Sequence, residues 1–139
     1  MNNHFKNIEI ETHGKQLIEL TEIVLAYLKK SNVKNGLLNL SILHTSASLV
    51  VQENASPSVT HDLNRFFDKL VPESTSEYLH NEEGPDDMPS HIRSALTNSN
   101  LTLSIIDTKL ALGTWQGIFL FEHRISKKRR NILIHIFGA

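Results

Sequence analysis

Hydrophobic and polar positions alternate with a period of two in several short stretches of the chain, which is typical of strands with one buried face. We predict strands over residues 5–11, 37–44, 46–53, 101–106, 117–125 and 131–137. In the second stretch, Leu38, Leu40, Ile42 and His44 share one face. The imidazole of His44 therefore ends an apolar row, and we expect it to point toward the interior.

Three other stretches, residues 15–30, 57–70 and 88–97, carry apolar residues at helical spacing. Ser56 and Pro57 supply an N-cap and a proline at the first helical position for the second of them. A long acidic segment, residues 72–87, separates the last two helices, and loops of this length are often functional. The partly segregated strands and helices predict an α+β fold with a mostly antiparallel, β-sandwich-like core and about three helices.

The chain has 139 residues, which predicts a single domain over 1–139. It contains no cysteine, which excludes a disulfide framework, a thiolate metal site and a cysteine nucleophile. Any metal must therefore be held by His, Asp or Glu. Neither a dinucleotide-binding glycine motif nor a P-loop is present, so nucleotide-binding classes have no support.

The net charge and the hydropathy of the chain limit the classes of partner that we expect. A net charge of −1 argues against a general nucleic-acid binder, which is usually strongly basic. No apolar run approaches the roughly 18 residues of a membrane span, and residues 1–11 are polar and charged, unlike a signal peptide. We therefore expect a cytoplasmic protein with no membrane association and no nucleic-acid partner.

Eight histidines stand in this short chain, and histidine is the commonest metal ligand. His44 ends a predicted strand, while His80 and His91 flank the acidic segment. Three neutral imidazoles with one open position would make a catalytic zinc site, with nearby acidic residues as further ligands or as outer acceptors that fix the imidazole tautomers. These acidic residues are Glu83, Asp86 and Asp87. The alternative is a solvated acidic loop with incidental histidines.

Hydroxyl groups at Thr45, Ser46 and Ser48, together with the helix beginning at Pro57, could bind an anion or could simply form caps. Arg93 lies about 200° around a helix from His91. It would need local distortion or a second subunit to share a pocket with that histidine.

Trp115 is the only tryptophan and stands between Gly113 and Gly117, where it could wall a pocket for a flat ring or anchor a hairpin. A basic segment, residues 127–130, is predicted as a turn between the last two strands. It could bind phosphate or form a solvated hairpin tip.

Four motifs together resemble the YjbQ family of small bacterial and archaeal proteins. They are His44-Thr45-Ser46-Ala47-Ser48, Glu83-Gly84-Pro85-Asp86-Asp87-Met88-Pro89-Ser90-His91-Ile92, Gly113-Thr114-Trp115-Gln116-Gly117-Ile118 and Glu122-His123-Arg124. The resemblance is clearest from Gly36 to Gly138. One departure is Ser126-Lys127-Lys128, where a glycine-rich turn is common in the family, whereas Arg129 and Arg130 fit its pattern.

The resemblance implies a single α+β domain that assembles as a compact homotrimer. It also implies a secondary thiamine-phosphate synthase activity, which joins a pyrimidine methyl diphosphate to a thiazole phosphate and releases pyrophosphate. A metal bound at a histidine cluster is implied as well, and we assign His44, His80 and His91 as its ligands. Zinc suits such a set, while Mg²⁺ would arrive with a diphosphate substrate.

On this basis the metal is expected to neutralise the leaving pyrophosphate as a Lewis acid, and Arg93 or Arg129 to add charge-assisted hydrogen bonds. Trp115 is expected to stack on the pyrimidine, and Glu53 or Asp86 to orient the nucleophile or a ligand water. Two alternatives stay open. One is a metal-dependent hydrolase of a small phosphate or amide, with Glu53 or Asp87 as general base; the other is a trimer that binds a metal or a small anionic metabolite without turnover.

Overall fold

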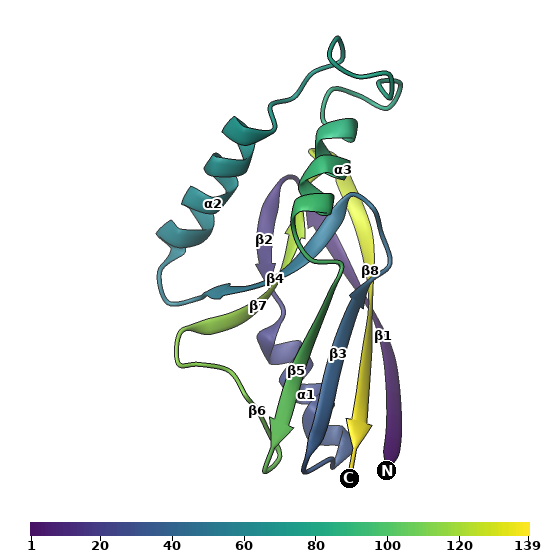
Figure 1. Cartoon of the computed structure of the whole chain (residues 1–139), viewed down its shortest axis with the longest axis vertical. Coiled ribbons are helices and arrows are strands. Elements are labelled where there is room, and N and C mark those ends of the chain that lie inside the picture. Colours follow the sequence, from purple (N-terminus) through teal and green to yellow (C-terminus); the bar gives the residue numbers. More distant parts are fainter.

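Two antiparallel β-sheets and three helices make up the computed structural model, which describes residues 1–139 (Figure 1). The strands are β1 (Asn2–His13), β2 (Gln16–Glu19), β3 (Gly36–Ile42), β4 (Ala47–Glu53), β5 (Asn100–Ile106), β6 (Lys109–Leu110), β7 (Gln116–Glu122) and β8 (Lys127–Gly138). The helices are α1 (Thr21–Ser31), α2 (Pro57–Leu70) and α3 (Asp87–Leu96). The predicted α+β class with a largely antiparallel, two-sheet core is confirmed.

The larger sheet has the strand order β1-β8-β3-β5-β6 and the smaller one the order β2-β7-β4. Alternate residues of the larger sheet point toward the smaller one, so Ile132, Ile134 and Ile136 of β8 are almost wholly buried. Leu20, Val24 and Leu28 of the α1 region complete this core. The core therefore lies between the curved larger sheet, the smaller sheet and α1.

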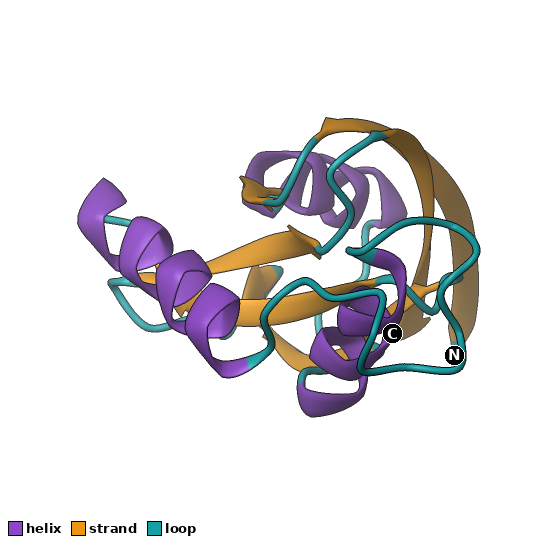
Figure 2. Cartoon of the chain, turned by 90° about the horizontal axis from the view of Figure 1, so that it is seen from above, coloured by secondary structure: helices purple, strands orange, loops and turns teal.

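Strand β7 is buried from Gly117 to Glu122 because both of its faces are covered. Ile118 and Leu120 belong to the core, whereas the Phe121 ring meets the edge of the Phe67 ring of α2 at 5.4 Å. Helix α2 thus lies on the outer face of the smaller sheet. None of its residues is fully buried, and Figures 1 and 2 show it extending from the body of the molecule.

Two sequence predictions about local structure are wrong. The helix predicted over residues 15–30 begins only at Thr21, because Gln16–Glu19 pairs with β7 as strand β2. Leu17 and Leu20 fit a helical period, but the same spacing is also compatible with a short strand followed by a helix. The backbone N–H of Leu20 still donates to the carbonyl of Ile118, at 2.7 Å, so strand pairing extends to the start of the helix.

The basic segment 127–130 is not a turn. It is the start of β8 and pairs with β1, from Lys127 opposite His13 to Arg130 opposite Ile10. The chain reverses earlier, over residues 123–126, and the predicted strand 117–125 accordingly ends at Glu122. Arg130 therefore points inward and is only 4% exposed, because its guanidinium donates to the buried carboxylate of Glu122.

One end of the molecule gathers the segments that carry most of the candidate chemistry. The turn after β3, the long loop before α3 and the turn between β7 and β8 all meet there (Figure 1). None of the three helices combines the length and the apolar character that crossing a bilayer requires.

Candidate metal centre

His80, Asp87 and His91 bring three ligand atoms within 4.8 Å of one another at this end of the molecule. Asp87 and His91 lie four residues apart on α3, which places their side chains on the same face of the helix. His80 comes from the preceding loop, and its ring meets that of His91 edge-on at a centroid distance of 5.4 Å. The helix therefore supplies two of the three groups, and the acidic loop the third.

The tautomer of His91 is set by a backbone contact. Its Nδ1 lies 2.9 Å from the carbonyl oxygen of Thr45, which can only accept, so Nδ1 carries the proton. In the neutral ring this leaves a lone pair on Nε2, 3.4 Å from Oδ1 of Asp87. Histidines that bind metals commonly donate their other ring nitrogen to a carbonyl or carboxylate in this manner.

Asp87 has one oxygen engaged and one without a hydrogen-bond partner. Oδ1 accepts from Nη1 of Arg124 at 2.6 Å. Oδ2 is buried and lies 2.7 Å from Nε2 of His80, but this contact lacks the alignment of a hydrogen bond. A buried carboxylate beside two imidazole nitrogens fits a divalent cation, whose ligands converge on a shared point.

Arg124 fixes this part of the loop to the end of β7. Its Nε donates to Oδ2 of Asp86 at 2.9 Å, and its Nη2 donates to the carbonyl of Glu83 at 2.9 Å. Burial disfavours the charged form of both aspartates, but Arg124 keeps the pKa of Asp86 and that of Asp87 below the ordinary value. For Asp86, the backbone N–H of Ile125 acts in the same direction. Both carboxylates are therefore held ionised.

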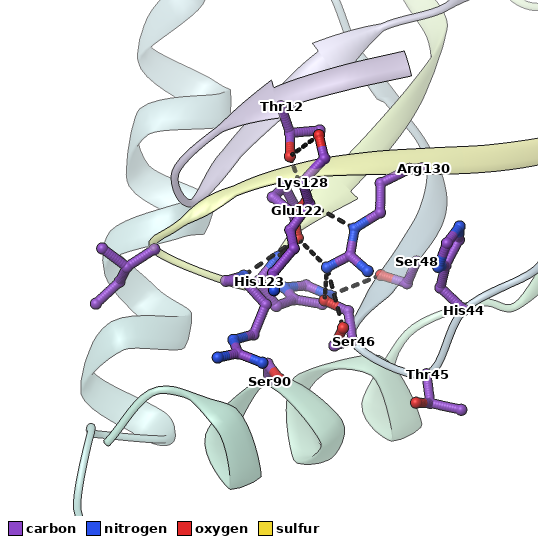
Figure 3. Close-up of polar contacts among 12 residues, drawn as sticks. Thr12, His44, Thr45, Ser46, Ser48, Ser90, Glu122, His123, Lys128 and Arg130 are labelled. Carbon is purple, nitrogen blue, oxygen red and sulfur yellow. Dashed lines mark hydrogen bonds and ion pairs between the residues drawn. The ribbon is translucent and has the colours of Figure 1, made fainter. Parts of the chain in front are cut away.

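Beneath the cluster lies a buried polar core centred on Glu122 (Figure 3). Its carboxylate accepts from Nε and Nη2 of Arg130 at 2.7 and 2.6 Å, and from the hydroxyl of Thr12 at 2.6 Å. Arg130 also donates to the carbonyl and the hydroxyl of Ser46. The turn after β3 is thereby tied to β8, which positions the Thr45 carbonyl that orients His91.

His123 is the second group of this buried core. Its Nε2 lies 2.8 Å from the Ser48 hydroxyl, and its Nδ1 accepts from Nε of Arg93 at 3.1 Å. Burial, reinforced by the charges of Arg93 and Arg130, lowers the pKa of His123 to about 3. The imidazole is therefore neutral, and it serves the hydrogen-bond network rather than the metal cluster.

The structure does not place His44 in the cluster with His80 and His91. Its Nε2 accepts from the backbone N–H of Asn131 at 2.7 Å, beyond the end of β3. Burial and the nearby Arg130 lower the pKa of His44. Asp87 takes the place that the sequence analysis gave to His44, because residues four apart on a helix share a face whereas the end of β3 is anchored to β8.

The four residues predicted to act on substrate are also dispersed. Arg93 is 1% exposed and donates to Asp68 and Asn64, so it binds α2 to α3. Glu53 lies at the far end of β4, about 20 Å along a strand that starts next to the polar core. Trp115 lies at that end too, 63% exposed, with its carbonyl accepting from the backbone of Asn54. Asp86 is paired with Arg124.

The buried ion pairs that support the site were not predicted from the sequence. Arg124 and Arg130 are the cations of these pairs, and Glu122 and His123 lie at the centre of the polar core. Arg130 was assigned to a turn although it keeps the two-residue alternation with the isoleucines of β8. That alternation was the available signal, since it places Arg130 on the inner face.

Comparisons with known proteins agree on one family. Residues 6–139 match the sequence model of a family described as "UPF0047 protein YjbQ-like". A UPF0047 protein of Synechocystis is 47% identical over 135 residues, covering 97% of this chain and 92% of the relative. The YjbQ protein of Escherichia coli O157:H7 is 46% identical over 114 residues, covering 82% of this chain and 80% of that protein.

Solved structures extend this agreement to the fold. A crystal structure from Clostridium acetobutylicum, described as an uncharacterized conserved protein of the same family, has 30% identity and a TM-score of 0.87. The match covers 95% of this chain and 99% of that one. A YbjQ-like protein of unknown function from Sulfolobus solfataricus has 25% identity and a TM-score of 0.91, with 99% of both chains covered.

Proposed function

The chain belongs to the UPF0047 family of YjbQ-like proteins, and from that premise we propose that it is a metal-dependent hydrolase of a small phosphate or amide substrate. The observation that carries the proposal is the convergence of the buried Asp87 carboxylate with the imidazoles of His80 and His91, whose ligand atoms all lie within 4.8 Å of one another. Two imidazole nitrogens and one carboxylate oxygen are a ligand set of catalytic zinc sites. When bound there, a divalent metal would supply a Lewis acid and lower the pKa of a water molecule.

The chain's own residues support this chemistry by orientation and access. The Thr45 carbonyl fixes the proton of His91 on Nδ1, and Arg124 holds the aspartate. The His80 side chain is 56% exposed and that of His91 is 29% exposed, so a small substrate can reach the cluster. Substrate access therefore comes from the side of the acidic loop.

Glu83 is the carboxylate that we assign as general base. Its exposed side chain lies beside that of Asp87. A solvent-reachable carboxylate next to the cluster can take a proton from an attacking water. The sequence predicted Glu53 or Asp87 for this role, but Glu53 lies at the opposite end of β4 and Asp87 belongs to the proposed ligand set.

Thiamine-phosphate synthase activity is the second candidate, and the exposure of Trp115 favours it. A ring that is 63% exposed can stack on a pyrimidine. Within one chain, Trp115 lies far from the histidines along the sheet, so this candidate needs a neighbouring subunit to complete the site.

We also propose that the chain assembles as a homotrimer. Helix α2 supports this, because it has no fully buried residue while Phe66 and Leu70 are 57% and 54% exposed. Such apolar exposure on a projecting helix favours association. Native mass measurement tests it, and a monomer in solution would contradict it. The cytoplasmic location and the absence of a nucleic-acid partner stay predictions.

Elemental analysis of the purified protein tests the metal site. We expect about one zinc or similar metal per chain, as one site of this type implies. The metal should be lost in His80→Ala, Asp87→Asn and His91→Ala. It should be kept in the matched controls His44→Ala and His61→Ala, since His61 lies exposed on α2. Stoichiometric metal in all three cluster variants would overturn the site.

Turnover separates the candidate reactions. The metal-loaded protein is assayed with a nitrophenyl phosphate, a nitroanilide and the two thiamine precursors. Hydrolysis that falls in both Asp87→Asn and Glu83→Gln supports the main proposal. Thiamine phosphate formation that depends on Trp115 instead supports the second candidate. A fully metallated protein that turns over none of these substrates would instead support a trimer that binds a metal or a small anionic metabolite without catalysis.

A further inference from the structure

The inward face of β1 begins with two polar residues where the fold calls for apolar ones. His4, Lys6, Ile8, Ile10 and Thr12 share one face of β1, but Lys6 is exposed and His4 only partly buried, whereas Ile8 and Thr12 are buried. His4 is opposite Ile136, and Lys6 is opposite Ile134. This end of the face is therefore open to solvent beside the core isoleucines instead of being covered by further apolar residues.

A cleft of about 210 Å³ lies at this place, between β1, β8 and α1. Ile134 and Ile136 form its apolar floor, and Tyr27 of α1 forms one wall. The volume is below the roughly 300–1,000 Å³ of sites for drug-sized molecules. The cleft therefore suits a small ligand of about one ring.

Two ammonium groups converge on the wall of this cleft. Nζ of Lys6 lies 5.6 Å from the centre of the Tyr27 ring, and Nζ of Lys30 lies 5.5 Å from it. No carboxylate lies within ion-pair distance of either lysine, although most of the arginines are paired. Two unpaired like charges beside one ring attract an anion.

His4 adds a buried polar atom that has no partner. It lines the same cleft, and its Nε2 is inaccessible to solvent and makes no hydrogen bond. An orphaned buried nitrogen is rare in folded proteins and calls for an explanation, such as an unrecognised ligand. The cleft thus combines the Tyr27 ring, two ammonium groups without a carboxylate partner and the partly buried His4 imidazole.

We propose that this cleft binds a small ligand with a planar apolar body and an anionic head, either a carboxylate or a phosphate. The planar body packs against the Tyr27 ring, above the almost wholly buried Ile134 and Ile136, and the head lies between Lys6 and Lys30. Figure 1 shows that α1 and the start of β1 lie at the end of the molecule opposite α3, so this site is separate from the metal cluster.

Methyl-resolved NMR of isoleucine-labelled protein tests the proposal with benzoate and phenyl phosphate as probes and benzyl alcohol as the neutral control. We expect at least one anion to shift the Ile134 and Ile136 methyl signals saturably, and benzyl alcohol to bind about tenfold more weakly, because it lacks the charge-assisted contacts. The better anion identifies the head group. Shifts confined to other methyl groups would overturn the proposal.

Charge variants supply the second arm of the test. Lys6→Gln and Lys30→Gln change exposed side chains, so both variants should fold. Each should weaken anion binding about tenfold. Lys29→Gln is the matched control, since Lys29 is adjacent in α1 but does not line the cleft. Equal loss of binding in all three variants, or no loss in any, would contradict the assignment.

Discussion

Arg93 donates a hydrogen bond through its Nε to Nδ1 of His123 at 3.1 Å, and this contact decides which nitrogen of the imidazole carries the proton. Because Nδ1 accepts, the proton of the neutral ring is on Nε2 and is donated to the Ser48 hydroxyl. A nitrogen that already carries a proton and donates it to the serine hydroxyl cannot also remove the proton of that hydroxyl. The buried Ser48–His123 pair is therefore structural and not a nucleophile with its base.

The burial of His123, reinforced by the charge of Arg93, predicts how stability depends on pH. The pKa of His123 is about 3 in the folded state against an ordinary value of 6.5, so the unfolded chain binds a proton first as pH falls. Stability is then fully present above pH 6.5 and declines as the pH falls toward 3, by up to about 5 kcal/mol for a shift of this size. Denaturant unfolding between pH 7 and 4.5 measures this decline.

His123→Gln is the control for that measurement. The glutamine amide can donate to Ser48 but does not titrate, so the slope of stability against pH should become clearly smaller. Protonation of Asp68, Asp86 and Asp87 begins only at lower pH, because their pKa values are lowered. An unchanged slope between pH 6.5 and 4.5 would show that the imidazole is not held neutral by the fold.

Zinc should stabilise the folded chain through His80, Asp87 and His91. At a free metal concentration a hundred times the dissociation constant, the gain is about 2.7 kcal/mol. Thermal unfolding with and without zinc measures it. Asp87→Asn should abolish the gain while His44→Ala keeps it, and a gain that survives in Asp87→Asn would place the metal elsewhere.

Arg124→Gln should destabilise the protein by about 3–5 kcal/mol, because it leaves two buried carboxylates without their cation. Asp86 and Asp87 both lose their ion pair in this variant. The matched control is Arg129→Gln, whose side chain is 72% exposed and which should change stability by less than about 0.5 kcal/mol. Urea unfolding compares them, and equal costs would mean that the buried pairs are not needed.

Gly36→Ala should destabilise the larger sheet by about 3 kcal/mol or more. A methyl group on Gly36 would overlap the carbonyl oxygen of Phe137 and lie 2.7 Å from Cα of Gly138, and both are backbone atoms that cannot move aside. Gly113→Ala is the control, since its methyl group would meet only the flexible end of Gln116, at 3.3 Å. Thermal unfolding should separate the two variants clearly.

Sequence periodicity was sufficient to predict most of the fold. The strand predicted over residues 37–44 and the helix predicted over 57–70 lie where β3 and α2 are observed. It failed at residues 16–19, where two apolar residues satisfied a helix and a strand equally well. Pairing with β7 is a tertiary contact, and no local pattern contains it.

The candidate site was harder to predict because it depends on loop geometry. His80 and His91 were singled out, but the choice between His44 and Asp87 as their neighbour depended on where the turn after β3 is anchored. The contact between His44 and Asn131 joins residues 87 positions apart in the chain. Spacing in the sequence carries no information about such a contact.

Strand β8 lies between β1 and β3, and it follows all seven other strands in the chain. During synthesis the inner strand of the larger sheet therefore leaves the ribosome after both of its neighbours. Until it arrives, β1 and β3 have no partner between them, and the core lacks Ile132, Ile134 and Ile136. Two strand edges therefore stay unpaired until β8 emerges, and the larger sheet can close only then.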